Sequence, residues 1–235
     1  MVTTTIELTT EPKVHRWTLE EYYKMADAGL FRGKHVELIE GEVIDKDDVP
    51  RVHLWTRREY YRLAEIGLFE GKRVELIEGQ VIEMSAMKSL HATAVTLAAE
   101  ALRKAFGEGW FVRVQAPLAI GGPTDPEPDI AVIEGDVRDY KGAHPKNADL
   151  VVEVSDTTLT YDRKRKASLY ARAWIEDYWI LNLNRRQLEV FHNPIADALA
   201  SAGFKYRDRQ IFKAGESVSP LAKLEVAIAV ADLLP

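Results

Sequence analysis

Two apolar segments, each carrying one carboxylate, constrain this chain more than any other feature. Residues 128–133 read Pro-Asp-Ile-Ala-Val-Ile, and residues 149–155 read Asp-Leu-Val-Val-Glu-Val-Ser. Continuous apolar strands of this kind are usually covered on both faces of a sheet. Asp129 and Glu153 are therefore expected among buried neighbours, where an isolated charge costs several kcal/mol or more.

Two buried carboxylates on neighbouring strands repel each other unless a cation lies between them. A hard divalent cation such as Mg²⁺ (or Mn²⁺) is the simplest candidate, because it prefers oxygen ligands. The sequence therefore predicts Asp129 and Glu153 as metal ligands. Two alternatives stay open: Asp129 only opens its strand after Pro128, or a lysine and one of the acids form a purely structural ion pair.

The segment that follows the second strand is expected to begin a helix that supplies an amine. At 100° per residue, Asp162, Lys166 and Tyr170 fall on one stripe, whereas Lys164 lies off it. Lys166 is therefore expected on the buried face, where an ammonium can orient a water or stabilise charge on a phosphate. Asp162 is expected to cap its own helix. The basic run 163–166 predicts either a phosphate cradle or a solvated face.

These residues resemble a known superfamily of nucleases. Asp129 in PEPDIAV, Glu153 in DLVVEVSD and the later lysine resemble the PD-(D/E)xK superfamily. From about residue 53 to the C-terminus, the segments VELIEGQVIEMS, PEPDIAVIEG, ADLVVEVSDTTLTYDRKRKASLYARAWIEDYWILNL and GESVSPL are similar to the Uma2 family of restriction endonuclease-like proteins. Ser155 stands where the parent motif has lysine, so Lys166, four residues before Tyr170, is the amine that fits.

The resemblance implies a function, a site and an assembly. It implies a Mg²⁺-dependent endonuclease that hydrolyses phosphodiester bonds of nucleic acid, with DNA as the expected substrate and a homodimer as the expected assembly. Asp129, Glu153 and Lys166 would be catalytic. Lys164 fits the lysine position less well and could lie in the second shell. Fold resemblance alone does not establish activity, so a non-catalytic scaffold that binds nucleic acid or protein is the alternative.

Three further residues are candidates for the site, each with an ordinary alternative. Glu75 could supply a further catalytic acid, or it could be a solvent-facing acid of a hairpin. His91 could be a base or an outer-shell ligand, or a histidine satisfied at a helix end. Gln115 could hold a metal-bound water, or it could pair with backbone.

An internal duplication precedes the apolar strands. Residues 15–45 repeat as residues 53–83, with His15 matching His53 and Trp17 matching Trp55. Each copy predicts a Thr-capped helix, a glycine stop and a hairpin with a Glu-Gly turn. The first copy could be a redundant duplication that packs on the sheet edge. Alternatively, it could be an arm for dimerisation or substrate binding.

The expected organisation is a disordered segment at residues 1–14, an added module with its linker at 15–52, and a restriction endonuclease-like domain at 53–235. Helix, hairpin, helix, strands, helix and strands follow in that order, which predicts an α/β fold, that is, a mixed α+β sheet flanked by helices. Further strands are predicted at residues 110–117, 177–183 and 187–192, a helix at 85–106, and a closing helix or strand at 222–234.

Composition excludes several classes of protein. The chain has no cysteine, which excludes disulfides and thiolate chemistry and suits a reducing cytoplasm. A net charge of −6 argues against a general nucleic-acid coat protein, but a nuclease needs only one local basic surface. No apolar run is long enough for a membrane span, and no other catalytic motif is present.

Overall fold

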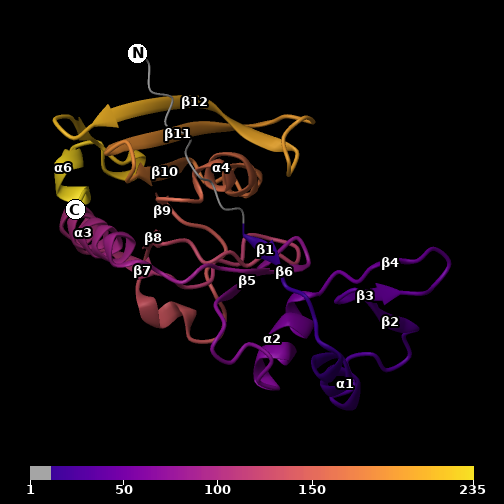
Figure 1. Cartoon of the computed structure of the whole chain (residues 1–235). Helices are drawn as coiled ribbons and strands as arrows, with labels where there is room; N and C mark the ends of the chain where they lie inside the picture. The colour runs from indigo at the N-terminus through magenta and orange to yellow at the C-terminus, as the bar shows by residue number, and fades with distance from the viewer. Residues whose placement is uncertain (1–11) are drawn as a thin grey trace. The chain divides into compact units, whose positions relative to one another are not determined.

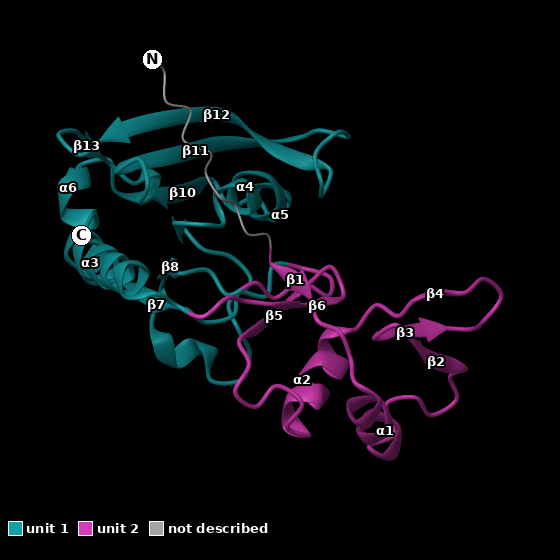
Figure 2. Ribbon diagram, viewed as in Figure 1, with its two compact units in different colours: residues 1–11, 87–120, 127–235 teal, residues 12–86, 121–126 magenta. Residues whose placement is uncertain are grey.

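The computed structural model describes residues 12–235, which form two compact units (Figure 1, Figure 2). Unit 1 comprises residues 87–120 and 127–235 of the described chain, and unit 2 comprises residues 12–86 and 121–126. Of the segment 1–14 that was expected to be disordered, residues 1–11 lie outside the described part. Lys13–Val14 form the short strand β1.

A six-stranded mixed sheet is the centre of unit 1. Its strand order is β12-β11-β10-β9-β8-β7, and only the central β9–β10 pair is parallel. The strands are β7 (Trp110–Val114), β8 (Ile130–Glu134), β9 (Leu150–Ser155), β10 (Asp177–Asn182), β11 (Gln187–Ala196) and β12 (Phe204–Lys213). The mixed sheet confirms the predicted fold class.

Helices cover both faces of this sheet, and the two-residue period of each strand decides which side chain meets which helix. Val152 and Val154 of β9 belong to a core with α3 (Ser89–Phe106). Val151 belongs to a second core with α5 (Ala167–Arg172). Because apolar residues occupy both parities, β9 reads as a continuous apolar run in the sequence.

Shorter elements complete unit 1. A helix of one turn, α4 (Leu159–Tyr161), leads into a π-helical turn (Asp162–Lys166) and then into α5. The predicted closing segment contains β14 (Ile228–Ala229), which pairs with β13 (Ser217–Val218), and the helix α6 (Val230–Leu233). Two short 3₁₀ turns lie at Val137–Tyr140 and Leu221–Lys223. Within residues 12–235, no helix is both long and apolar enough to cross a membrane.

Unit 2 contains both copies of the repeat, and each copy folds in the same way. The first copy has α1 (Leu19–Asp27) and the hairpin β2–β3 (Val36–Ile39, Glu42–Asp45), followed by β4 (Arg51–Val52). The second copy has α2 (Arg57–Glu65) and the hairpin β5–β6 (Val74–Ile77, Gln80–Glu83).

The local chemistry of the repeat explains this shared structure. Thr18 and Thr56 cap their helices, each in a reciprocal capping box with the glutamate three residues later. In both turns the glutamate and the glycine have positive φ, at 49° and 79° in the first copy and 49° and 78° in the second. Two consecutive residues with positive φ are what a tight two-residue hairpin requires, so the predicted Glu-Gly turns are confirmed.

The second copy also holds a loop that the first copy lacks. Residues 121–126 run beside β5, where the Asp125 N–H donates to the Leu76 carbonyl at 2.7 Å. The Asp125 carboxylate is buried and accepts hydrogen bonds from the Arg57 Nε at 2.7 Å and the Tyr61 hydroxyl at 3.0 Å. The loop is therefore fixed on unit 2 by a charged anchor.

The variant Asp125→Asn tests this anchor. It leaves Arg57 and Tyr61 without their charged acceptor, so the free energy of unfolding should fall by about 1–3 kcal/mol, as for other hydrogen bonds to charged groups. Denaturant titration measures the change. The control Glu65→Gln removes an exposed ion pair with Arg62 and should change stability by less than about 0.5 kcal/mol. Equal effects of the two variants would contradict the assignment of Asp125 as an anchor.

Candidate active site

Strand register brings the two predicted acids together on one face of the sheet. Ile130 pairs with Val152, so Asp129 and Glu153 are the next residues on the two antiparallel strands. The Val154 N–H donates to the Asp129 Oδ2 at 2.9 Å, and the Asp129 N–H reaches the Glu153 Oε2 at 3.4 Å. The alternation of side chains puts both acids on the α5 face, together with Val151.

Lys166 reaches the same place from the helical side. Its Nζ donates to the Glu153 Oε1 at 2.9 Å, and the Tyr170 hydroxyl donates to the same oxygen at 2.7 Å. Lys166 and Glu153 are only 2% and 3% exposed. The parent motif has a lysine at the position of Ser155. In this chain the amine comes instead from Lys166 in the helical segment that follows β9.

A π-helical turn carries Lys166 into the core. The Ala167 N–H donates to the Asp162 carbonyl five residues earlier, and both Asp162 and Lys166 are buried in this turn. π-turns inside α-helices are uncommon and frequently lie at functional sites. Lys164 of the same turn is exposed, and it lines a surface cavity with Ser201 and Phe204.

Asp162 does not cap its own helix, which corrects the prediction. It lies after α4 rather than at a helix start, and its Oδ2 accepts a hydrogen bond from the Thr158 hydroxyl at 2.7 Å. Its side chain is buried, and the nearby Lys166 opposes the effect of burial on its pKa. Asp162 is thus a third carboxyl group near the lysine.

His91 and Gln115 both contact Asp129. The His91 Nε2 lies 3.0 Å from the Asp129 Oδ1, and the Gln115 Nε2 donates to the same oxygen at 3.2 Å. His91 stands in the first turn of α3, and Gln115 directly follows β7. With Val154 on the other oxygen, the Asp129 carboxylate is held from three elements.

The surroundings shift the pKa values of the two strand acids in opposite directions. Burial raises the pKa of Asp129, but the His91 hydrogen bond and charge, the Val154 amide and Lys166 outweigh it and hold that pKa below its usual value. Burial raises the pKa of Glu153 and outweighs the attraction of Lys166, while Asp129 and Asp162 raise it further. One acid is therefore ionised, and the other retains a proton more readily.

The remaining predicted residues lie elsewhere. Glu75 on β5 of unit 2 is fully buried, so the alternative of a solvent-facing hairpin acid is wrong. Its catalytic role stays a prediction, because Asp129 belongs to the other unit. In the basic run 163–166, Arg163 pairs with the buried Glu189 and Lys166 pairs with Glu153. The run is therefore not an open phosphate cradle, since two of its four side chains bind carboxylates of their own unit.

Comparison with known proteins assigns the chain to a family. A family model described as "Uma2: Putative restriction endonuclease" matches residues 57–231. The chain belongs to the Uma2 family. A solved structure described as "a putative nuclease belonging to DUF820 from Anabaena variabilis ATCC 29413" has a TM-score of 0.54 and 14% sequence identity, and the match covers 76% of this chain and 96% of that one. At this identity the likeness shows the fold. No curated protein matches the chain.

In this Uma2 chain, the donor set fits a divalent cation that is bound partly by water and substrate. Mg²⁺ is commonly held by one or two carboxylates, with waters and phosphate oxygens completing its shell. Asp129 and Glu153 would supply the two carboxylates. No group of three or more acidic, histidine or cysteine ligands occurs among residues 12–235, so the site differs from a metal cage made by protein alone.

Tyr170 also contacts this cluster, although the sequence pattern indicated only that it lies on the buried stripe. It is fully buried, and its hydroxyl shares the Glu153 Oε1 with Lys166. A tyrosine on the buried face of a helix usually needs a hydrogen-bond partner. Its spacing of four residues from Lys166 was therefore the signal available in the sequence.

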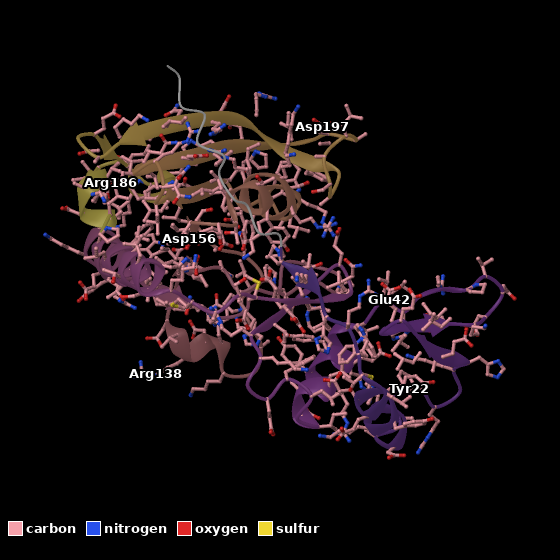
Figure 3. All side chains as sticks on the ribbon, in the orientation of Figure 1. Tyr22, Glu42, Arg138, Asp156, Arg186 and Asp197 are labelled. Carbon is pink, nitrogen blue, oxygen red and sulfur yellow. The ribbon has the colours of Figure 1, made fainter. Side chains whose placement is uncertain are left out.

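The pair Lys166–Glu153 can be tested by a double-mutant cycle. Lys166→Met leaves a buried acid without its cation, and the free energy of unfolding should fall by about 3–5 kcal/mol. Glu153→Gln should lower it as well. The double variant should lose less than the sum of the single variants by more than about 1 kcal/mol, measured by denaturant titration. The exposed pair Lys88–Asp156 (Asp156 is labelled in Figure 3) is the matched control and should be nearly additive. Additive effects at Lys166 and Glu153 would contradict the coupling.

The ion pair that fixes Arg163 predicts a dependence of stability on pH. Burial opposes ionisation of Glu189, but Arg163, Asn182 and Arg209 outweigh it and lower the pKa of Glu189 to about 2. This carboxylate therefore stabilises the fold above its unfolded pKa of about 4.3, and the contribution is lost as the pH falls towards 2. Wild type should exceed Glu189→Gln by on the order of 2 kcal/mol at pH 7, and the difference should shrink below pH 4. A pH-independent difference in urea titrations would refute this, and exposed Glu225→Gln is the control.

Proposed function

We propose that this Uma2 protein is a metal-dependent endonuclease that hydrolyses phosphodiester bonds of DNA. The observation that carries the proposal is the convergence of Asp129, Glu153 and Lys166 in one buried, hydrogen-bonded cluster. Family membership and the fold support a nuclease-like function, and the three side chains are of the types that phosphodiester hydrolysis needs.

Asp129 and Glu153 would hold Mg²⁺ or Mn²⁺. When bound, such a cation supplies a water of lowered pKa and neutralises charge on the scissile phosphate. Asp129 is already ionised and oriented by His91, Gln115 and the Val154 amide, so its direction is fixed before any ligand arrives. Pre-orientation of this kind lowers the cost of organising the site during the reaction.

Lys166 would position the attacking water or donate to a non-bridging oxygen of the phosphate. Its ammonium is held by Glu153, which also accepts from Tyr170. The side chains of His91 and Asp129 are 17% and 12% exposed, whereas those of Lys166 and Glu153 are 2% and 4% exposed. The substrate phosphate would therefore approach from the side of Asp129 and His91.

Three wider features belong to the same proposal. The protein would act as a homodimer, because a cut through duplex DNA needs a site for each strand. It would act in the cytoplasm, which the cysteine-free sequence suits. Lys164, although exposed and away from the acids, would contribute at most a contact to a distant phosphate.

Shape-conserving variants test the catalytic assignment. Asp129→Asn, Glu153→Gln and Lys166→Met should each lower the cleavage rate at least about 100-fold, because each removes a charge that stabilises the transition state. The assay follows cleavage of plasmid DNA and of labelled oligonucleotides with Mg²⁺ or Mn²⁺, and chelation of the metal should abolish it. Lys164→Ala is the matched control and should retain most activity. A wild-type rate in any of the three variants removes that residue from the mechanism.

Calorimetric titration with Mn²⁺ separates the enzyme from the scaffold alternative. Wild-type protein should bind the metal, and Asp129→Asn and Glu153→Gln should each abolish binding while circular dichroism shows an intact fold. If the wild-type protein binds DNA but no metal, the non-catalytic nucleic-acid-binding scaffold is the better reading, with Lys166 and Glu153 as a structural ion pair.

A further inference from the structure

The two copies of the repeat in unit 2 exchange their short first strands. β1, which leads into the first copy, pairs with β6 of the second copy, with Lys13 opposite Glu83 and Val14 opposite Ile82. β4, which leads into the second copy, pairs with β3 of the first, with Arg51 opposite Asp45 and Val52 opposite Ile44. The two pairings are equivalent under the repeat, because each copy completes the hairpin of the other.

The polar contacts across the two copies are reciprocal as well. Lys34 of the first copy pairs with Glu59 of the second, and Lys72 of the second pairs with Glu21 of the first at 2.7 Å. A histidine from each copy does the same: His15 contacts Glu83, and His53 lies 2.8 Å from the Asp45 Oδ1. In each of these pairs, the equivalent residues repeat the contact in the opposite direction.

The apolar centre of the shared face follows the same rule. Trp17 and Trp55 are equivalent residues, and their rings meet each other edge to face with centroids 5.3 Å apart. Trp17 also lies 6.2 Å from Phe69, and Trp55 lies 6.4 Å from the equivalent Phe31. Buried residues of both copies, including Met25, Leu63 and Val81, form a single hydrophobic cluster.

In an isologous interface, a surface patch binds an identical patch, so every contact occurs twice and residues near the axis meet their own equivalents. The reciprocal contacts of the two copies, with Trp17 against the equivalent Trp55 at the centre, have this pattern. Such a patch is not specific for a copy on the same chain, because the second chain presents the same residues. What selects the occupant is the short connection between β3 and β4, residues 46–50, which holds the two copies at a high effective concentration.

We propose that the two repeats form an isologous interface that can be exchanged between chains: the first repeat occupies it within one chain, and the equivalent repeat of a second copy of this chain takes its place when the connection at residues 46–50 cannot span the two copies. Its partner is the equivalent face of another molecule, joined by exchange of β1 and β4 and by the pairs of Lys34 with Glu59 and Lys72 with Glu21. The proposal is independent of any nuclease activity.

Deleting residues 46–50 tests the proposal in the full chain. Without these residues β3 runs directly into β4, so no hairpin can close, and the second copy has to dock on the first copy of another chain. Since the natural chain has no cysteine, the double variant Lys34→Cys/Glu59→Cys reports the connectivity through a short bis-maleimide reagent. With the natural loop the linked product should run at the mass of one chain on a denaturing gel. After the deletion it should run at twice that mass.

Controls make the readout specific. The symmetry-related pair Lys72→Cys/Glu21→Cys should switch in the same way, and insertion of five Gly/Ser residues after Asp48 should leave both links within one chain. Single-cysteine variants measure chance collisions. Links that stay within one chain, or that disappear, in a deletion variant whose fold is intact by circular dichroism would overturn the proposal.

A second experiment covers the case in which the deletion variant does not fold. Chains with the natural loop, one carrying Lys34→Cys and the other Glu59→Cys, are unfolded together and refolded over a range of protein concentrations. Exchange predicts a link between the two chains whose yield rises with concentration. No link above the level of the single-cysteine controls at any concentration would refute the docking surface.

Discussion

The pairing of the buried Lys166 ammonium with nearby carboxyl groups is the interaction on which the core of unit 1 depends. The lysine favours the ionised forms of Asp129, Glu153 and Asp162, but burial outweighs it at two of them and raises the pKa of Glu153 to about 8 and that of Asp162 to about 6. Without this cation, three acids in one apolar core would either protonate or destabilise the fold. The same contact therefore has two consequences: it offsets part of the cost of burying these acids, and it places an amine beside the carboxylates that a nuclease would use.

The burial of Asp129 and Glu153 could be predicted because side chains alternate between the two faces of a sheet. A strand with apolar residues at both parities must be covered on both faces, so an acid inside it has to find a partner. Strand periodicity indicated Asp129 and Glu153, and the helical stripe together with the family resemblance indicated Lys166; the structure places these three together. A structural ion pair and a catalytic lysine have the same geometry before metal and substrate bind, so the sequence pattern predicts where these residues lie and not which of the two roles they have.

Other parts of the structure left weaker signals in the sequence. The π-turn at Asp162–Lys166 depends on tertiary packing, and a period of 3.6 residues cannot reveal it, which is why Asp162 was expected to be a cap. β12 was not predicted, because most of its side chains are exposed and Lys205, Arg207, Asp208 and Arg209 interrupt any apolar alternation. It is an edge strand, and its ten residues are specified by pairing with β11 rather than by their own composition.

The two copies share the features that form their local structure, but they differ in the residue that anchors the loop 121–126. Both copies keep the capping box, the Glu-Gly turn and the bond from a tyrosine hydroxyl (Tyr22, labelled in Figure 3, or Tyr60) to a strand carbonyl at 3.0 Å. Only the second copy has Arg57, which anchors the loop 121–126, and the equivalent Leu19 is 60% exposed. The first copy therefore lacks the means to hold a loop, whereas the residues of the shared face are identical or similar in the two copies, with Met25 in place of Leu63 and Asp45 in place of Glu83. In addition to its own cap, turn and tyrosine hydrogen bond, the first copy retains the face towards its duplicate, so packing against the second copy contributes to its stability.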